Sequence, residues 1–332
     1  MFTSKPITYL LSLYLQIILP LDLIYSIFTK RYDTIVEYVL LAIYAIAIFF
    51  FIYSFSYWEY TNFYLRYVYC FFIIAGVSLI IYRIVSTDIT VFGDLIDLEG
   101  QPGTVILTIG LIIVDISIIL SKINKKNCFD LAFPFKNGRY LVVDGGDGKV
   151  SYFSNYHYHG WKNTNVSNYQ IMRYAVDIIK MNKYGFANKI LPASNQDYNI
   201  FGEKVYSPVD GEVVSVDRNN DDNIPYGKLP DNWGNRITIK NNKHNISLYH
   251  FKKDTLVVYV GQKLKVGDYL GEVGNSGKSS RPHIHIHVVY CEDNEYRLGA
   301  GMPITFDNRY PVKNCVIKDY QQPVLNEEIV YE

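Results

Sequence analysis

Long apolar runs fill the first third of the chain, and short alternating runs replace them in the remainder. The apolar runs cover residues 6–28, 38–58, 67–82 and 104–121. The second and third runs carry no charge, and the first and fourth carry only Asp22 and Asp115. Because a helix needs about 20 mostly apolar residues to cross a bilayer, this pattern predicts an all-α transmembrane region of about four helices at residues 1–121.

Beyond residue 122, apolar and polar residues alternate over short stretches that Gly, Asn and Asp separate. Alternation is typical of half-buried strands, and turn residues between strands are typical of antiparallel structure. The predicted strands are 139–143, 150–153, 174–179, 213–216, 236–239, 246–250, 257–260, 269–273 and 283–289. Many short strands with few helical stretches predict a C-terminal all-β domain, either a sandwich or an open barrel.

The change of pattern also suggests where the domains divide. We expect the transmembrane region at 1–121, a linker at 122–135, a β domain at 136–306 and a C-terminal tail at 307–332. The 332 residues carry a formal net charge of +0, which argues against nucleic acid as a main partner. The cysteine spacing indicates neither a disulfide framework nor a cysteine zinc site.

Basic residues give a weak indication of orientation. Four spans place both ends of the chain on one side of the membrane, together with Lys5, Arg66, Lys122, Lys125 and Lys126. The other side receives Lys30, Arg31 and Arg83, and the acidic residues Asp88, Asp94, Asp97 and Glu99. Counting positive charges favours a cytoplasmic β domain by a small margin. Asp115 lies within the fourth span, where a functional role and a contact with a neighbouring helix both stay open.

Histidines concentrate the candidate chemistry in the second half of the chain. All seven follow residue 150, and three lie in the segment Arg281-Pro282-His283-Ile284-His285-Ile286-His287. In a strand, alternation places the three imidazoles on one face. Imidazole is the commonest protein ligand for transition metals, so the segment outlines a metal site. The alternative is a surface strand that happens to carry histidines.

Several motifs around this segment resemble the lysostaphin/LytM-type zinc metallopeptidases. The matching stretches are Tyr206–Val214 (YSPVDGEVV), Leu248–Phe251 (LYHF), Val260–Asp268 (VGQKLKVGD), Gly271–Gly277 (GEVGNSG) and Pro282–His285 (PHIH). The resemblance covers roughly residues 130–306. It implies a duplicated-hybrid-motif β-sandwich or open barrel whose groove holds one zinc ion. It also implies a bacterial protein with its catalytic domain outside the cytoplasm.

One expected ligand of that family is replaced. The family holds zinc through an H-x-x-x-D segment and the second histidine of H-x-H. Asp177 and His285 match two of these ligands, but Arg173 stands where the first histidine is expected. A guanidinium has no acceptor and cannot bind a metal. Alternation would place Arg173 and Asp177 on one strand face.

Three explanations follow: an inactive enzyme, a metal-free binding domain, or an arginine that pairs with a carboxylate while another residue supplies the third ligand. We favour the last. Asn155-Tyr156-His157 together with the RYAVD segment resembles a variant pattern of some bacterial members. The resemblance therefore points to His157 as the replacement ligand, with His159 or His287 as alternatives.

The resulting prediction is a membrane-anchored zinc metalloendopeptidase that hydrolyses peptide cross-links of peptidoglycan with a zinc-activated water. Within the resemblance, His250 and His283 match the family's catalytic histidines, which do not bind the metal. Its partners would be peptidoglycan peptides and the lipid bilayer. Two alternatives stay open: an inactive or metal-free regulatory module, and a phosphocarrier-like domain that takes phosphate on His250. The phosphocarrier alternative leaves Asp177 and His285 without a role.

Overall fold

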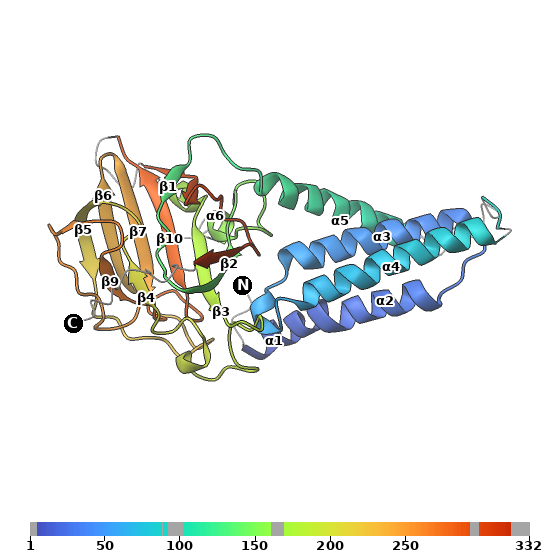
Figure 1. Cartoon of the computed structure of the whole chain (residues 1–332), viewed down its shortest axis with the longest axis horizontal. Coiled ribbons are helices and arrows are strands. Elements are labelled where there is room, and N and C mark those ends of the chain that lie inside the picture. The colour runs from blue at the N-terminus through green and yellow to red at the C-terminus, as the bar shows by residue number, and fades with distance from the viewer. Residues whose placement is uncertain (1–4, 88, 92–101, 161–168, 293–298, 320–332) are drawn as a thin grey trace, which may run out of the picture.

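The computed structural model describes residues 5–87, 89–91, 102–160, 169–292 and 299–319. It has two parts: elongated helices on one side and a β domain on the other (Figure 1). The acidic residues Asp88, Asp94, Asp97 and Glu99, used above for orientation, lie outside the described residues, as do residues 320–332 of the predicted tail.

The helical part contains four segments that are long and apolar enough to cross a membrane: Tyr9–Thr29, Ile35–Phe55, Leu65–Ser86 and Pro102–Ser121. The first combines α1 (Lys5–Leu13), a π-helical turn (Tyr14–Ile18) and α2 (Leu19–Thr29), and the others are α3, α4 and α5. This confirms the predicted helical region. The loop between α3 and α4 lies at the end of the bundle that meets the β domain, and the start of α5 lies at the other (Figure 1).

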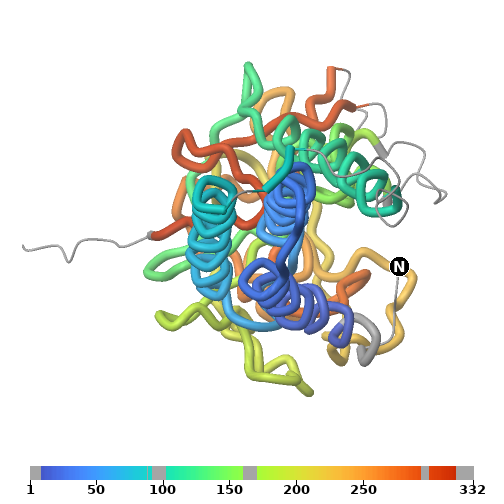
Figure 2. Tube along the Cα trace, turned by 90° about the vertical axis from the view of Figure 1, so that its right-hand side faces the viewer, coloured from blue at the N-terminus to red at the C-terminus, as the bar shows by residue number. Residues whose placement is uncertain are grey.

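Polar side chains define the helix ends. Thr34 and Glu37 form a reciprocal capping box that begins α3, which satisfies backbone N–H groups at the start of the helix. Arg83, buried near the end of α4, donates to the carbonyl oxygens of Ile27, Phe28 and Lys30 where α2 ends. Seen end-on, α3 lies between α4 and α5 (Figure 2).

The β domain is built on an open antiparallel sheet of nine strands in the order β13-β2-β3-β10-β7-β6-β5-β8, with β11 paired to β10. Its strands are β2 (Gly138–Asp144), β3 (Val176–Met181), β5 (Gly211–Asp217), β6 (Asn235–Asn241), β7 (His244–Phe251), β8 (Lys263–Leu264), β10 (Ile284–Tyr290), β11 (Ala300–Met302) and β13 (Val316–Asp319). Two small sheets pair β1 (Phe129–Leu131) with β12 (Ile304–Phe306), and β4 (Lys204–Tyr206) with β9 (Tyr269–Glu272). The predicted all-β domain is confirmed, and the described strands form no closed barrel.

Two predicted strands are wrong. Residues 150–153 form turns, because the N–H groups of Val150 and Ser151 both donate to the carbonyl oxygen of Asp147. Residues 257–259 have no regular secondary structure and Val260 lies in a turn, with the Val257 N–H donating to the carbonyl oxygen of Leu270. Conversely, the predicted C-terminal tail, for which no strand was predicted, supplies β13 as an edge strand that pairs with β2.

A set of buried contacts joins the helices to the β domain. The Asn314 side chain donates to the carbonyl oxygens of Ser54 and Ser56 at the end of α3, at 3.0 and 3.1 Å. Arg66 of α4 donates to the carbonyl oxygen of Asn314 and lies over the Tyr53 ring. The two bonds from Asn314 satisfy carbonyl groups that the end of α3 leaves unpaired. The domain is therefore fixed against the helix ends rather than loosely tethered.

We expect Asn314→Gly to loosen this junction. Glycine tolerates the positive φ of 64° at this position, but it removes the amide that serves two buried acceptors. The apparent stability of the full chain in detergent should fall by about 1–3 kcal/mol, measured as a shift of the thermal transition. Asn242→Gly is the control, because that residue lies in an exposed turn with a φ of 52°. Equal shifts for the two variants would contradict the role of the Asn314 amide.

Candidate metal centre

Strand pairing places a row of polar side chains across the sheet. Asp144 of β2 lies opposite Asp177 of β3, Asp177 lies opposite His285 of β10, and His285 lies opposite Tyr249 of β7. Directly opposed residues project from the same face of a sheet. The register therefore brings Asp177 and His285 together although 108 positions separate them in sequence.

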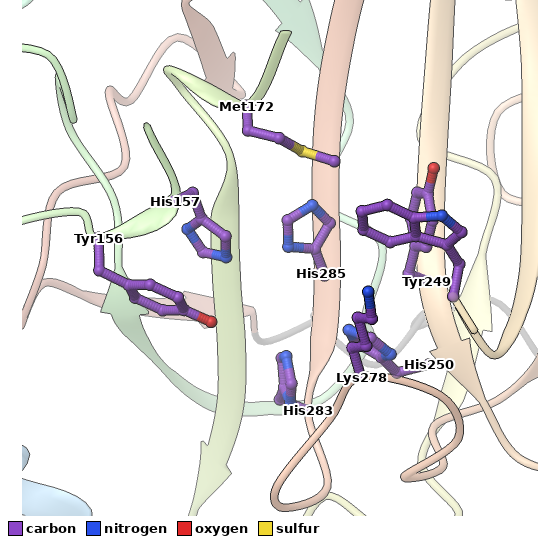
Figure 3. A pocket seen from close by; sticks show the side chains of 9 residues that line it. Tyr156, His157, Met172, Tyr249, His250, Lys278, His283 and His285 are labelled. Carbon is purple, nitrogen blue, oxygen red and sulfur yellow. The ribbon is translucent and has the colours of Figure 1, made fainter. Parts of the chain in front are cut away.

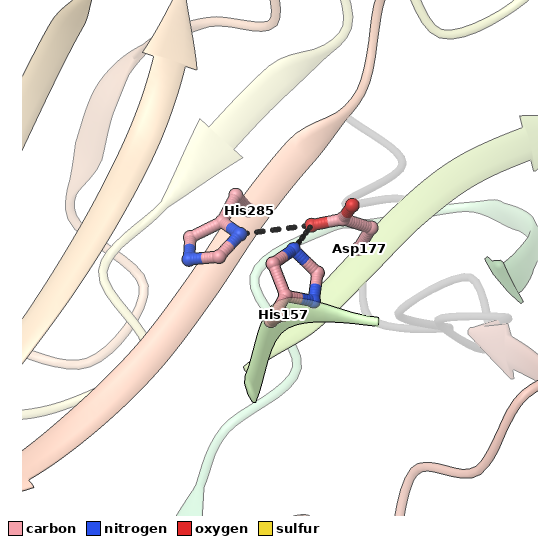
Figure 4. A group of neighbouring side chains, drawn as sticks. All are labelled: His157, Asp177 and His285. Atoms are coloured by element: carbon pink, nitrogen blue, oxygen red, sulfur yellow. Dashed lines mark hydrogen bonds and ion pairs between the residues drawn. The ribbon is translucent and has the colours of Figure 1, made fainter. Parts of the chain in front are cut away.

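Three side chains converge on one buried point (Figure 4). Nδ1 of His285 lies 2.9 Å from Oδ1 of Asp177, and Nε2 of His157 lies 3.3 Å from the same oxygen. One potential ligand atom from each residue lies within 4.8 Å of the other two. Two imidazole nitrogens and one carboxylate oxygen are a common donor set for zinc and leave a fourth position open. The chemistry of this group therefore fits one zinc ion.

His157 approaches the sheet from the short helix α6 (His157–Gly160), and Asn155 orients it. The buried Asn155 amide donates to the carbonyl oxygens of Ala175 and Gly146, at 2.8 and 3.1 Å. Its side-chain oxygen accepts from Nδ1 of His157 at 2.8 Å. Because an amide oxygen can only accept, the ring proton is on Nδ1. Nε2, which faces Asp177, therefore carries the lone pair in the neutral ring, the form in which histidine binds a metal.

Two more histidines present acceptor nitrogens beside this group (Figure 3). Nδ1 of His250 lies 2.8 Å from the carbonyl oxygen of Ser276, and Nδ1 of His283 lies 2.8 Å from that of Arg281. Both rings must donate through Nδ1, so both leave Nε2 unprotonated. The ring centroids lie 4.7 Å apart, and Nε2 of His283 lies 3.5 Å from Oδ2 of Asp177.

A β-bulge brings His250 to this position. Asn235 and Arg236 of β6 lie opposite Phe251 and Tyr249, so His250 is the extra residue between them. Its φ of 73° is uncommon for a residue other than glycine. Regular alternation would point His250 to the opposite face from Tyr249. The bulge re-aims the side chain, as bulges beside active sites commonly do.

Burial and neighbouring charges determine the protonation states. Burial lowers the pKa of His285 to about 4 and holds that of His250 well below its ordinary value. Burial would also lower the pKa of His157, but the negative charge of Asp177 outweighs it and raises that pKa. For Asp177, burial favours the neutral acid, but His157 and His283 hold its pKa well below the usual range. Burial also lowers the pKa of His283. The carboxylate is therefore ionised, and His250, His283 and His285 are neutral.

Beside these residues lies a small cavity of about 20 Å³ that is lined in part by His157, His250, His283 and His285. This volume suits about one water molecule. Tyr249 also borders a wider hollow of about 330 Å³ over β5, β6 and β7, lined by polar side chains that include Arg236, Thr238 and Asn245. An extended chain on this face would pass next to the smaller cavity.

Arg173 has a structural partner. Its guanidinium donates to both carboxylate oxygens of Asp147, at 2.7 and 2.6 Å, and Lys125 lies 3.2 Å from the same carboxylate. The predicted shared strand face with Asp177 is wrong, because turns that precede β3 hold Arg173 and Ala175 outside the strand. Arg173 thus pairs with a fully buried carboxylate and is not part of the three-residue donor group.

The structure brings together all five residues proposed from the sequence: His157, Asp177, His285, His250 and His283. Of the alternative ligands, His159 lies outside the donor group next to Tyr152, and His287 hydrogen bonds to Nε2 of His285 at 3.0 Å.

Sequence reasoning missed the residues that support the centre: Glu59, Asp144, Asp147, Asn155, Arg281 and Lys313. Asn155 appeared only as part of the motif that pointed to His157, and Glu59 is a lone acid in the aromatic stretch FSYWEYTNFY. Such an aromatic stretch is typical of a belt at the membrane surface, but Trp58 and Tyr60 are buried.

An open antiparallel sheet with a His, Asp, His donor group and two flanking acceptor histidines is typical of a metal-dependent hydrolase. Residues 195–297 match peptidase family M23. This part of the chain is therefore an M23 peptidase domain, which confirms the resemblance found in the sequence. Asp177 and His157 lie before the matched residues and join the centre through β3 and α6.

Similar proteins agree with this assignment. An uncharacterized metalloprotease of Buchnera aphidicola is 32% identical over 102 residues, 30% of this chain and 26% of the relative. The peptidoglycan DD-endopeptidase ShyB of Vibrio cholerae is 27% identical over 123 residues, 37% of this chain and 26% of the relative. The chain thus spans about a quarter of the length of these two relatives.

Two solved structures are also similar to parts of the chain. One is a zinc containing peptidase from Vibrio cholerae, at 18% identity, covering 51% of this chain and 37% of that chain with a TM-score of 0.29. The other is the catalytic domain of lysostaphin from Staphylococcus simulans, at 25% identity, covering 40% of this chain and 76% of that chain with a TM-score of 0.26.

We expect Arg173→Gln to lower stability without removing the metal. The substitution leaves the buried Asp147 carboxylate with Lys125 as its remaining cation, which should cost about 2–3 kcal/mol, since breaking a fully buried pair costs about 3–5 kcal/mol. Thermal unfolding and zinc content of the purified full chain measure the two effects. Lys180→Gln is the control, because its partner carboxylate, Glu203, is 21% exposed whereas Asp147 is 0% exposed. Loss of this pair should cost less than about 1 kcal/mol. Loss of zinc from folded Arg173→Gln would contradict this role.

Proposed function

We propose that this chain is a membrane-anchored zinc metalloendopeptidase that cleaves peptide bonds in peptidoglycan cross-links. The observation that carries the proposal is the convergence of His157, Asp177 and His285 on one buried point, with His250 and His283 beside it. The M23 domain supports the peptidase assignment. The similarity to a peptidoglycan DD-endopeptidase supports the substrate class.

His157 Nε2, Asp177 Oδ1 and His285 Nδ1 would hold the metal. When bound, zinc supplies Lewis acidity, which acidifies water and polarises a carbonyl oxygen. The neutral rings of His250 and His283 line the small cavity beside the centre. Their Nε2 atoms can accept a proton from an attacking water. Once protonated, either ring can donate to the oxyanion that forms on the scissile carbonyl. The hydrogen bonds from Nδ1 of each ring to a backbone carbonyl oxygen keep both rings in the same orientation during proton transfer.

We also propose that the main sheet of the β domain begins near residue 136 and that residues 122–135, which contribute β1 to a small sheet, join the domain to the membrane region. We place the domain outside the cytoplasm. Two of the five basic residues that favour the opposite orientation, Arg66 and Lys125, have structural roles. Arg66 donates to Asn314, and Lys125 pairs with Asp147. Their position is therefore explained without a cytoplasmic location, and the proposed substrate lies outside the cell membrane.

Zinc content tests the ligand set. We expect about one zinc per full-length chain in detergent. His157→Ala, Asp177→Ala and His285→Ala should each weaken zinc binding by more than the roughly 10- to 100-fold that loss of an outer-shell partner costs. His244→Ala is the control, because His244 lies at the start of β7 and outside the donor group. A wild-type chain that binds no zinc under conditions that load other zinc proteins would refute the proposal.

Digestion of purified peptidoglycan tests the chemistry. His250→Ala and His283→Ala should keep zinc but lose activity by about 10²- to 10⁴-fold, the usual contribution of a positioned acid or base. Release of new peptide amino groups from sacculi measures the activity. Zinc-loaded wild type that releases none would exclude the peptidoglycan substrate.

Protease access tests the orientation. A protease added to intact spheroplasts should cleave the β domain, because we place that domain outside the membrane. A cytoplasmic protein of the same cells serves as the control for leakage. Cleavage of the β domain only after lysis would place it in the cytoplasm and remove its access to peptidoglycan.

A further inference from the structure

The loop between α3 and α4, residues 56–64, lies against the β domain rather than free at the membrane surface. The Phe63 N–H donates to Gly185 at 3.0 Å, and the Asn62 side chain donates to Tyr184 at 2.8 Å. Trp58, at the centre of this 56–64 loop, is fully buried. The loop is thus held in one position relative to the domain.

Within the loop, Glu59 forms an ion pair with Arg281. Oε1 of Glu59 lies 2.5 Å from Nε of Arg281, and the two side chains are 3% and 14% exposed. Among the described residues, neither Glu59 oxygen has a well-aligned hydrogen-bond donor, so the pair is held by charge. Removing one partner of a buried pair leaves an uncompensated buried charge. The position of Arg281 therefore depends on Glu59.

Arg281 in turn holds a residue of the candidate centre. Its carbonyl oxygen accepts from Nδ1 of His283 at 2.8 Å, and the Ser279 hydroxyl donates to the same oxygen at 2.8 Å. This contact fixes both the tautomer and the orientation of the His283 ring. A shift of the Arg281 backbone would turn Nε2 of His283 away from the centre.

Other contacts of the loop lie next to this pair. The Nζ of Lys313 lies 3.5 Å from the centre of the Tyr57 ring and 3.4 Å from the Asp144 carboxylate, which is opposite Asp177 in the sheet. Tyr60 contacts Tyr226 through their hydroxyl groups. The 56–64 loop is therefore linked through Lys313 to Asp144, the neighbour of Asp177 in the sheet.

We propose that Glu59, a residue of the membrane region, is a positioning residue for His283. It fixes Arg281, whose carbonyl oxygen holds the His283 ring, so the centre is complete only while the 56–64 loop is docked on the β domain. The inference rests on the proposed function for the role of His283. It makes the membrane region part of the peptidase rather than an anchor alone.

Glu59→Gln in the full-length chain tests the proposal. The kcat for peptide hydrolysis should fall about 10- to 100-fold, the usual cost of losing a supporting partner, while KM and zinc content stay unchanged. Glu37→Gln is the matched control, because Glu37 lies in the same helical region at the start of α3, in a capping box with Thr34. Glu59→Asp keeps the charge on a shorter side chain and serves as the test variant if Glu59→Gln does not fold.

Combination with His283→Ala distinguishes positioning from general docking. If Glu59 acts through His283, Glu59→Gln should cause no further loss of kcat in the His283→Ala chain, because effects that share one residue are not additive. If Glu59 only supports docking of the domain, the two losses should multiply. Multiplying losses, or an unchanged kcat in Glu59→Gln alone, would overturn the proposal and leave the proposed peptidase function intact.

A second readout does not depend on hydrolysis. Diethyl pyrocarbonate acylates unprotonated imidazole nitrogens, and mass spectrometry of peptides gives a rate for each histidine. In the zinc-free chain, the rate at His283 should rise in Glu59→Gln and stay at the wild-type value in Glu37→Gln, with His244 as the internal reference. An unchanged His283 rate in Glu59→Gln would refute the positioning role even if the wild-type chain proves inactive.

Discussion

The buried carboxylate of Asp177 is the constraint on which the β domain depends. An ionised acid inside a protein is stable only when it is paired and hydrogen-bonded. Asp177 is 4% exposed, and imidazoles of His157, His283 and His285 surround its two oxygens. Because these partners come from α6, from β10 and from the residue just before β10, the central pairing of β3 with β10 and the placement of α6 must form together for the charge to be compensated.

A second layer of buried charges surrounds this centre and follows the same rule. Asp144 is paired with Lys313, and Asp147 is paired with Arg173 and Lys125. Such pairs add little net stability, but each is costly to break. They therefore fix positions more than they stabilise the fold. They tie the linker, the tail and the turn before β3 to one arrangement around Asp177.

The sequence predicted the helices and most strands, which local patterns determine. It did not predict the contacts between distant segments that support the centre. Apolar runs gave the helices, and alternation gave most strands of the sheet. The prediction failed at residues 150–153, where turns around Asp147 replace a strand. The identity of the residues at the centre came from motif resemblance, including His157. Supporting residues such as Asn155 and Arg281 could not be predicted, because their roles arise from contacts between segments whose spacing no local pattern encodes.

The replacement of the expected first histidine by Arg173 is compatible with a complete donor set, because ligands are defined by position in space and not by their order in a motif. Tetrahedral zinc needs donor atoms that converge with lone pairs free. His157 would satisfy this from α6, since its Nδ1–H donates to the Asn155 side-chain oxygen and its Nε2 faces Asp177. The turn that removes Arg173 from the strand also brings it to Asp147, beside the segment that leads to Asn155. The arginine therefore supports the segment that carries His157, so its pairing with Asp147 and the position of that histidine belong to one arrangement of the chain.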